Sequence, residues 1–207
     1  MNKGSSRKIS GSSGPRHGRR TGKTVVSAGK LRLAIAGYGG RGRDLFNLAA
    51  RSFPCLEPAA ICDFSAEARE LASKDVPGVP VYEDVATMLD ACRPDALIVA
   101  TPADFHADLC VQALDAGVSV LSEIPVVNSY GEARRLWDAH LKSKALYMAG
   151  ANPNFWGFVE AAAQFRKDGS LGEPFYMEAE YVHDVRGLFA KTPWRTKFVS
   201  IKYCTHS

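Results

Sequence analysis

The chain has 207 residues, which is enough for one complete domain and part of a second. Its hydrophobic content of 46% is ordinary for a globular protein, and no run approaches the roughly 20 apolar residues that cross a bilayer. The net charge of +4 comes from one end of the chain. Eight of the 26 Lys and Arg lie in residues 1–30, which hold no Asp or Glu. In the rest of the chain, the other 18 Lys and Arg are outnumbered by 22 Asp and Glu. The folded part therefore has no overall bias toward nucleic acid, and we expect neither nucleic acid nor membrane as a partner.

Residues 1–30 form the basic segment. Twelve of them are Gly or Ser and few are large and apolar, so burial cannot offset the entropy of ordering them. We predict a disordered basic tail over 1–30.

A glycine-rich loop follows the first apolar run, 31–36, which has the pattern of a buried parallel strand, and precedes a helical pattern over 42–52. The loop consists of Gly37, Tyr38, Gly39, Gly40, Arg41 and Gly42. Its three spaced glycines match G-x-G-x-x-G, in which they allow a tight turn, close approach of a pyrophosphate, and close helix–strand packing. Free N–H groups at the helix start would then hold the phosphate charge, so the loop predicts dinucleotide binding.

A carboxylate stands at the distance that such a site requires. Asp63 ends a second strand, 58–62, about 20 residues beyond the last glycine, where it would bond the adenosine ribose hydroxyls. A carboxylate repels the 2′-phosphate of NADP, and no Arg or Lys stands at Phe64, Ser65 or Ala66. We therefore predict NAD rather than NADP. The alternative is an α/β domain whose turn needs glycine for backbone reasons only.

From residue 31 the chain alternates strand and helix, which predicts right-handed crossovers and a doubly wound parallel sheet, the Rossmann fold. Ser65 is the expected N-cap of the second helix. The further helices are predicted over 65–74, 84–91, 103–117 and 131–144, and the further strands over 79–82, 95–100, 118–122 and 146–152. About six strands are thus complete by residue 152, and 31–152 is the predicted dinucleotide-binding domain.

The turn after the fourth strand carries Thr101, Pro102 and His106. Ligands of open α/β sheets bind outside the carboxyl ends of the strands, so we expect these residues to line the cofactor site. A lone histidine at a helix start is more often structural than catalytic.

The pattern changes after residue 152. Residues 153–169 predict one amphipathic helix ended by Gly169, and 175–185 alternate apolar and polar residues as a one-sided strand does. We interpret 153–207 as an incomplete C-terminal substrate domain with an open sheet.

The five cysteines are odd in number and lack C-x-x-C spacing, which argues against a zinc site or a disulfide framework. They are Cys55, Cys62, Cys92, Cys110 and Cys204. Most are expected to be buried apolar residues in a reducing compartment, which favours a cytoplasmic location.

Taken in order, the segments GYGGRG, Asp63, ATPADFH, SEIP, EAEYVHD and YCTHS resemble the Gfo/Idh/MocA oxidoreductases over residues 31–207. The resemblance implies an N-terminal NAD(P)-binding Rossmann domain, a C-terminal open-sheet domain, and a substrate related to sugars, inositols or polyols. It further implies that Glu123 points toward the cofactor and that Pro125 belongs to the same motif, where an X-Pro bond can be cis.

One position departs from the family pattern. The usual signature is Glu-Lys-Pro with a catalytic lysine, but Ile124 stands in the middle and can neither donate a proton nor stabilise an alkoxide. A branch similar to NAD-dependent glycosidases often carries an apolar residue there. By resemblance to that branch, Tyr181 is the candidate base and His206 the candidate sugar contact, although Tyr181 is equally well explained as a sheet aromatic. No metal is expected.

Three functions remain open from the sequence. The first is an NAD-dependent oxidoreductase acting on a sugar-like or polyol-like small molecule, with the NAD-dependent redox glycosidase as its variant. The second is a C-terminally truncated dinucleotide-binding protein without turnover, because family members are far longer. The third is an interaction protein that uses its basic tail. The substrate and the oligomeric state, including a homo-oligomer, are not fixed by the sequence.

Overall fold

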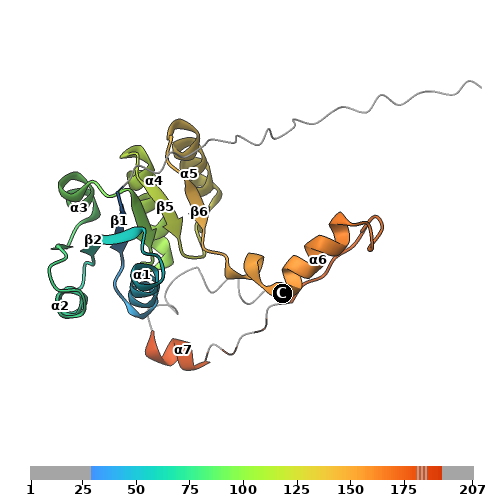
Figure 1. The fold of residues 1–207 in the computed structure, drawn as a ribbon, viewed down its shortest axis with the longest axis horizontal. Helices are drawn as coiled ribbons and strands as arrows, with labels where there is room; N and C mark the ends of the chain where they lie inside the picture. Colours follow the sequence, from blue (N-terminus) through green and yellow to red (C-terminus); the bar gives the residue numbers. More distant parts are fainter. Residues whose placement is uncertain (1–28, 181, 183, 185, 193–207) are drawn as a thin grey trace, which may run out of the picture.

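The described part of the chain forms one parallel β-sheet flanked by helices (Figure 1). The computed structural model describes residues 29–180, 182, 184 and 186–192, so most of the predicted basic tail lies outside the described residues. Among these residues all strand pairings are parallel, and the six strands lie in the order β3-β2-β1-β4-β5-β6. The strands are β1 (Leu31–Ala36), β2 (Leu56–Cys62), β3 (Val81–Tyr82), β4 (Ala96–Val99), β5 (Ser119–Ser122) and β6 (Tyr147–Ala149). This order is that of a Rossmann fold, so the predicted fold class is confirmed.

Helices cover both faces of the sheet. The helices that connect the strands are α1 (Gly40–Ser52), α2 (Ala66–Asp75), α3 (Val85–Cys92), α4 (His106–Asp115) and α5 (Tyr130–Lys142). A one-turn 3-10 helix, Ala103–Phe105, precedes α4. Helices α1 and α2 pack on one face, and α3, α4 and α5 pack on the other.

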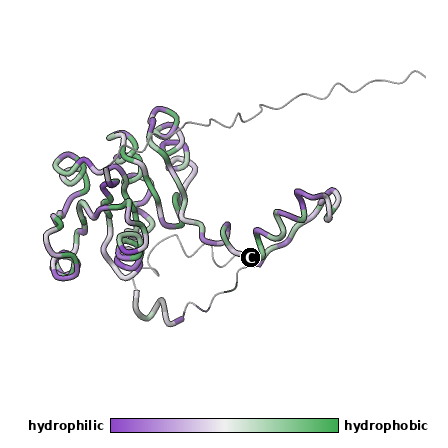
Figure 2. The backbone as a smooth tube through the Cα atoms, in the orientation of Figure 1, coloured by the Kyte–Doolittle hydropathy of each residue, from purple (hydrophilic) through white to green (hydrophobic). Residues whose placement is uncertain are grey.

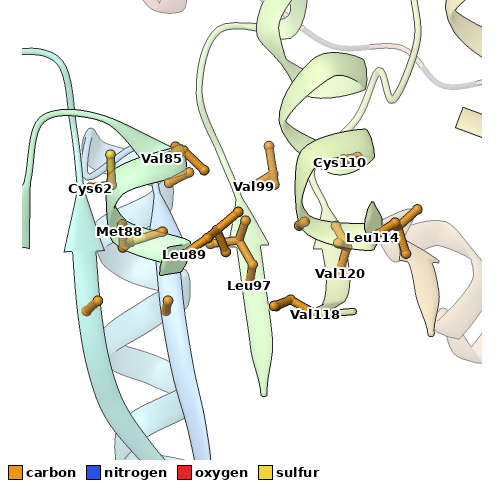
Figure 3. Packing of buried hydrophobic residues seen from close by; sticks show 14 of the residues in the cluster. Cys62, Val85, Met88, Leu89, Leu97, Val99, Cys110, Leu114, Val118 and Val120 are labelled. Carbon is orange, nitrogen blue, oxygen red and sulfur yellow. The ribbon is translucent and has the colours of Figure 1, made fainter. Parts of the chain in front are cut away.

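The core divides into two layers because alternate residues of each strand point to opposite faces. On β1, Leu33 and Ile35 contact the α1 layer, whereas Ala34 and Ala36 contact the α3–α5 layer. Figure 3 shows the second layer, in which helix residues such as Leu89 and Leu114 close over the sheet. The apolar colouring of the central strands in Figure 2 fits a sheet that is buried on both faces.

The helix starts follow from short polar side chains. Ser65 accepts a hydrogen bond from the Ala68 amide at the start of α2, as expected, and Asp84 accepts from the Ala86 and Thr87 amides at the start of α3. Each cap satisfies backbone donors that the first turn of a helix leaves unpaired. Gly117, with φ of +75°, follows the end of α4 in the predicted role.

The region after β6 differs from the prediction. The single helix expected over 153–169 is divided at Trp156, whose extended backbone (ψ 136°) separates the 3-10 helix Asn152–Phe155 from α6 (Gly157–Lys167). Residues 175–180 do not form the expected strand, because no described segment pairs with them and a strand requires a hydrogen-bonded neighbour. Helix α6 projects from the sheet in Figure 1, and α7 (Arg186–Lys191) follows. Whether 153–207 belong to a second domain stays a prediction.

The buried thiols should be chemically inert. Burial raises the pKa of Cys62 to about 12 and that of Cys110 to about 11, so both keep their proton at neutral pH and lack nucleophilic thiolate. In a Cys204→Ser variant at pH 8, we expect a thiol reagent to label Cys55, which is exposed, rapidly and to label Cys62 and Cys110 only after denaturation.

The same shifts give a sign for the pH dependence of stability. The unfolded chain loses these thiol protons near pH 8.5–9, whereas the folded chain holds them to higher pH. The unfolding free energy should therefore fall as the pH rises above about 9. Rapid native labelling of Cys62 would contradict the buried assignment.

Candidate functional site

Two glycines of the loop between β1 and α1 are required by their surroundings. Gly37 has φ of +93°, and a Cβ there would lie 2.7 Å from the backbone of Ala100 and Thr101. A Cβ on Gly42 would collide with the carbonyl oxygen of Gly37. The loop is thus pressed against the turn after β4, which places the start of α1 at the carboxyl ends of β1 and β4, the switch point of the sheet.

The start of α1 is open. Gly39 is the N-cap and makes no side-chain cap, the first turn holds no acidic residue, and a Cβ on Gly39 or Gly40 would meet nothing within 4 Å. The first amides of a helix have no intrahelical acceptor, and the helix dipole favours negative charge near them. This arrangement fits a phosphate group, as the sequence predicts.

Asp63 faces the loop from the end of β2. Its Oδ2 accepts a hydrogen bond from the Tyr38 amide at 2.7 Å, its Oδ1 accepts from the Ser65 amide at 2.9 Å, and the residue is 9% exposed. A carboxylate has about four lone-pair positions, so two remain for ligand hydroxyls. The carboxylate stands across from the start of α1, where the adenosine ribose was expected.

Tyr38 contributes its backbone to the site and its ring to the core. The ring is 1% exposed and packs edge-on against Phe46 at a centroid distance of 6.3 Å. Burial raises the pKa of its phenol, which lies 3.4 Å from the Asn47 amide nitrogen. The predicted cofactor contact of Tyr38 is therefore limited to its main chain.

The turn after β4 carries Thr101 and Pro102 at the expected edge, but His106 lies beneath that edge. The imidazole is 2% exposed, with Nε2 at 2.7 Å from the Thr101 carbonyl oxygen and Nδ1 at 2.8 Å from the Pro125 carbonyl oxygen. The ring thus supports two turns, as a lone histidine at a helix start most often does, and its predicted place in the cofactor site stays a prediction. The Ile124–Pro125 bond is cis, the isomer that the sequence left open.

Glu123, which follows β5, and Arg41, in the first turn of α1, form an ion pair. Arg41 Nε lies 2.6 Å from Glu123 Oε1. The ion pair joins the start of α1 to the end of β5, across the end of β4. A pocket of about 200 Å³ lies beside this pair on the α1 face of β4, β5 and β6. Its lining includes Arg41, Leu45, Glu123, Met148, Asn152 and Phe155.

The ion pair should add little stability. Because the Arg41 side chain is 48% exposed, solvent screens the attraction, and Glu123→Gln should lower the unfolding free energy by about 0–1 kcal/mol. Denaturant unfolding measures this, with Arg134→Gln as the matched control, since Arg134 pairs with Asp138 on the exposed face of α5. A loss of more than about 2 kcal/mol would show that the pair is a main structural tie.

Arg69 is the residue that the sequence reasoning missed. Its Nη1 donates to the carbonyl oxygens of Asp63 (2.9 Å) and Phe64 (2.8 Å), and its Nη2 pairs with Glu83 at 3.1 Å. The guanidinium therefore lies close to the proposed ribose site, but its donors are engaged. The position of Arg69 in the sequence could have indicated this role. Arg69 lies in the first turn of α2, from which its side chain reaches back to the end of the strand before the helix.

The candidate catalytic residues Tyr181 and His206 lie outside the described residues. Within 29–180 and the short described stretches beyond, no group of three or more His, Cys, Asp or Glu could hold a metal ion. The same part of the chain contains no helix that is long and apolar enough to span a membrane.

Known proteins resemble this chain in both sequence and fold. A D-glucoside 3-dehydrogenase from Escherichia coli is 29% identical over 76% of the chain and 45% of its own length, and a glycosyl hydrolase family 109 protein from Stenotrophomonas maltophilia is 30% identical over 77% and 37%. A solved scyllo-inositol dehydrogenase from Lactobacillus casei, with bound NAD(H) and scyllo-inositol, has a TM-score of 0.63 at 22% identity over 70% of this chain and 43% of its own. The chain thus spans less than half the length of these relatives.

A family model matches this chain over most of the sheet domain. Residues 31–151 match the model of the Gfo/Idh/MocA oxidoreductase family, which is described as its NAD-binding Rossmann fold. This range contains the glycine-rich loop and the turns after β2, β4 and β5. The chain therefore belongs to the Gfo/Idh/MocA oxidoreductase family and carries its NAD-binding Rossmann domain.

Proposed function

We propose that this chain is the cofactor-binding part of an NAD-dependent oxidoreductase that acts on a sugar-like or polyol-like small molecule. The proposal rests mainly on one observation. The start of α1, at Gly39 and Gly40, is open and has no side-chain cap, and the Asp63 carboxylate lies across from it. The dehydrogenase relatives named above support the choice of reaction, and the inositol and glucoside in their names support the choice of substrate class.

The described residues fit NAD in three ways. The amides at the start of α1 would bind the diphosphate, and the free lone pairs of Asp63 would accept the ribose hydroxyls of the adenosine half. The same carboxylate would repel a 2′-phosphate, and Arg69 is already occupied by Glu83 and two carbonyl groups. We therefore propose NAD, rather than NADP, as the cofactor.

The nicotinamide half would lie toward β4 and β5, because the two halves of a dinucleotide lie on either side of the switch point. When bound, NAD supplies the acceptor for a hydride from a substrate C–H bond. Thr101, Pro102 and Pro125 would border that half, while Glu123 and Arg41 offer a carboxylate and a guanidinium beside the pocket of about 200 Å³. Ile124, which is 51% exposed at this edge, leaves the site without the proton donor of the usual family signature.

A second candidate function is an NAD-dependent redox glycosidase. It is favoured by the apolar side chain of Ile124 and by the family 109 relative. In that case Tyr181 would be the base and His206 the sugar contact. A third candidate is dinucleotide binding without turnover by this chain, which spans 37% and 45% of the length of the two curated relatives named above.

Calorimetry on the purified chain tests the core of the proposal. We expect NAD to bind with a dissociation constant in the micromolar range and NADP to bind at least tenfold more weakly. Equal affinity for the two would remove the NAD preference, and no heat with either would remove the cofactor assignment. NADH production with a panel of inositols and sugars, beside hydrolysis of nitrophenyl glycosides with added NAD, separates the dehydrogenase from the glycosidase.

A further inference from the structure

His106 is the only described histidine that connects two ligand-facing turns. It is the first residue of α4, and its buried side chain lies between the turns after β4 and β5. Its two ring nitrogens approach carbonyl oxygens from separate segments: Thr101, after β4, at 2.7 Å, and Pro125, after β5, at 2.8 Å. Both distances are those of good hydrogen bonds.

The chemistry of the partners decides what the ring must supply. A carbonyl oxygen has lone pairs and no proton, so each contact is a hydrogen bond only if the ring nitrogen donates. At 2% exposure, water cannot take the place of either partner. Both ring nitrogens are therefore held against carbonyl groups, one from each turn.

The two turns have few other ties. Asn128 donates from Nδ2 to the Ala103 carbonyl oxygen at 3.1 Å, which fixes the segments further from the strand ends. The backbone ladder stops at the bond from the Glu123 amide to the Val99 carbonyl oxygen, at 2.8 Å. Beyond that point, His106 sets the separation of Thr101 from Pro125, which are the borders of the proposed nicotinamide site.

We propose that His106 is a positioning residue that fixes the spacing of the turns after β4 and β5 and so shapes the site for the nicotinamide half. This inference rests on the proposed function, since it takes NAD as the ligand. The adenosine half is bound by other elements, α1 and the end of β2. Loss of the ring should therefore weaken NAD binding while leaving binding of ADP unchanged.

The experiment compares two ligands across three proteins. Wild type, His106→Asn and the control His140→Asn, which replaces a histidine on α5, are titrated with NAD and with ADP. An Asn side chain donates from one nitrogen only and cannot span both carbonyls. We expect His106→Asn to bind NAD about tenfold more weakly and ADP within twofold of wild type, with no change for His140→Asn.

The possible failures are distinguishable. If wild type binds ADP but not NAD, or neither, the proposed function fails. If wild type binds NAD and His106→Asn weakens NAD and ADP equally, or weakens neither, the positioning role fails. Should His106→Asn not fold, His106→Gln is titrated in its place: a tenfold loss of NAD affinity with ADP unchanged would support the inference, and NAD affinity within twofold of wild type would overturn it.

Discussion

Gly42→Ala should abolish measurable NAD binding, with a loss of at least 100-fold in affinity. The added Cβ would collide with the Gly37 carbonyl oxygen and lie 3.2 Å from the Ala100 Cβ, and these neighbours are backbone or short side chain with no flexible end to move. The loop must therefore separate from α1 or from the turn after β4. Overpacking of this kind typically costs about 1–3 kcal/mol and occasionally more, and a 100-fold loss corresponds to about 2.7 kcal/mol.

Gly40→Ala is the matched control for folding, because a Cβ at Gly40 meets nothing within 4 Å. Alanine is favoured over glycine in a helix by up to about 1 kcal/mol, so this variant should unfold at the same temperature as wild type or slightly higher. Calorimetry and thermal unfolding are measured on both variants. NAD binding by Gly42→Ala within threefold of wild type would show that the close approach of α1 to the loop is not needed for the site.

Asp63→Asn should weaken NAD binding by about 10–100-fold and remove most of the preference for NAD over NADP. The substitution keeps an oxygen that accepts one of the two backbone hydrogen bonds from Tyr38 and Ser65, but it removes the charge. Hydrogen bonds to charged groups contribute about 1.5–3 kcal/mol, which gives the expected range for NAD. NADP should lose less, or gain, because the repulsion of its 2′-phosphate disappears.

Asp90→Asn on the exposed side of α3 makes the same change of charge away from the site and should alter neither affinity. The ratio of the two dissociation constants is the quantity to compare, since a general loss of folded protein lowers both affinities together. An unchanged ratio in Asp63→Asn would move the source of specificity elsewhere, with Arg69 as the next residue to substitute.

Much of the sheet domain could be predicted because its signals are local. Buried strands show as short apolar runs, helix starts show as Ser65 or Asp84 before a helical pattern, and the glycine spacing marks one tight turn. The edges of elements moved by one to three residues, which is the usual uncertainty where a helix begins or a strand frays.

The details of the site depend on contacts between distant residues, which periodicity does not report. The Arg41–Glu123 pair joins residues 82 positions apart, and the direction of the His106 ring is set by carbonyl groups of two turns. Tyr38 looked like a cofactor residue because of its place in the loop, but its ring finds an apolar partner in Phe46. These choices are made by packing and hydrogen bonding after the fold has formed.

The strand expected over 175–185 fails in its described residues for a related reason. Alternation of apolar and polar residues shows that a segment suits a sheet, but the sheet itself requires a partner strand. Residues 175–180 are exposed and have no such partner among the described residues. Local preference alone does not hold an extended segment in place.

The strand order also determines when the glycine-rich loop can form as the chain is synthesised. The first strand of the sequence lies in the middle of the sheet, where Leu33 pairs with Ala96 and Ala36 pairs with Val99. As the chain leaves the ribosome, β1 therefore lacks a strand partner on one side until β4 has been synthesised. Pairings so far apart in sequence are closed slowly, and the backbone of Ala100 that confines Gly37 arrives only then. The nascent chain must consequently reach about residue 101 before the turn that confines the glycine-rich loop is in place.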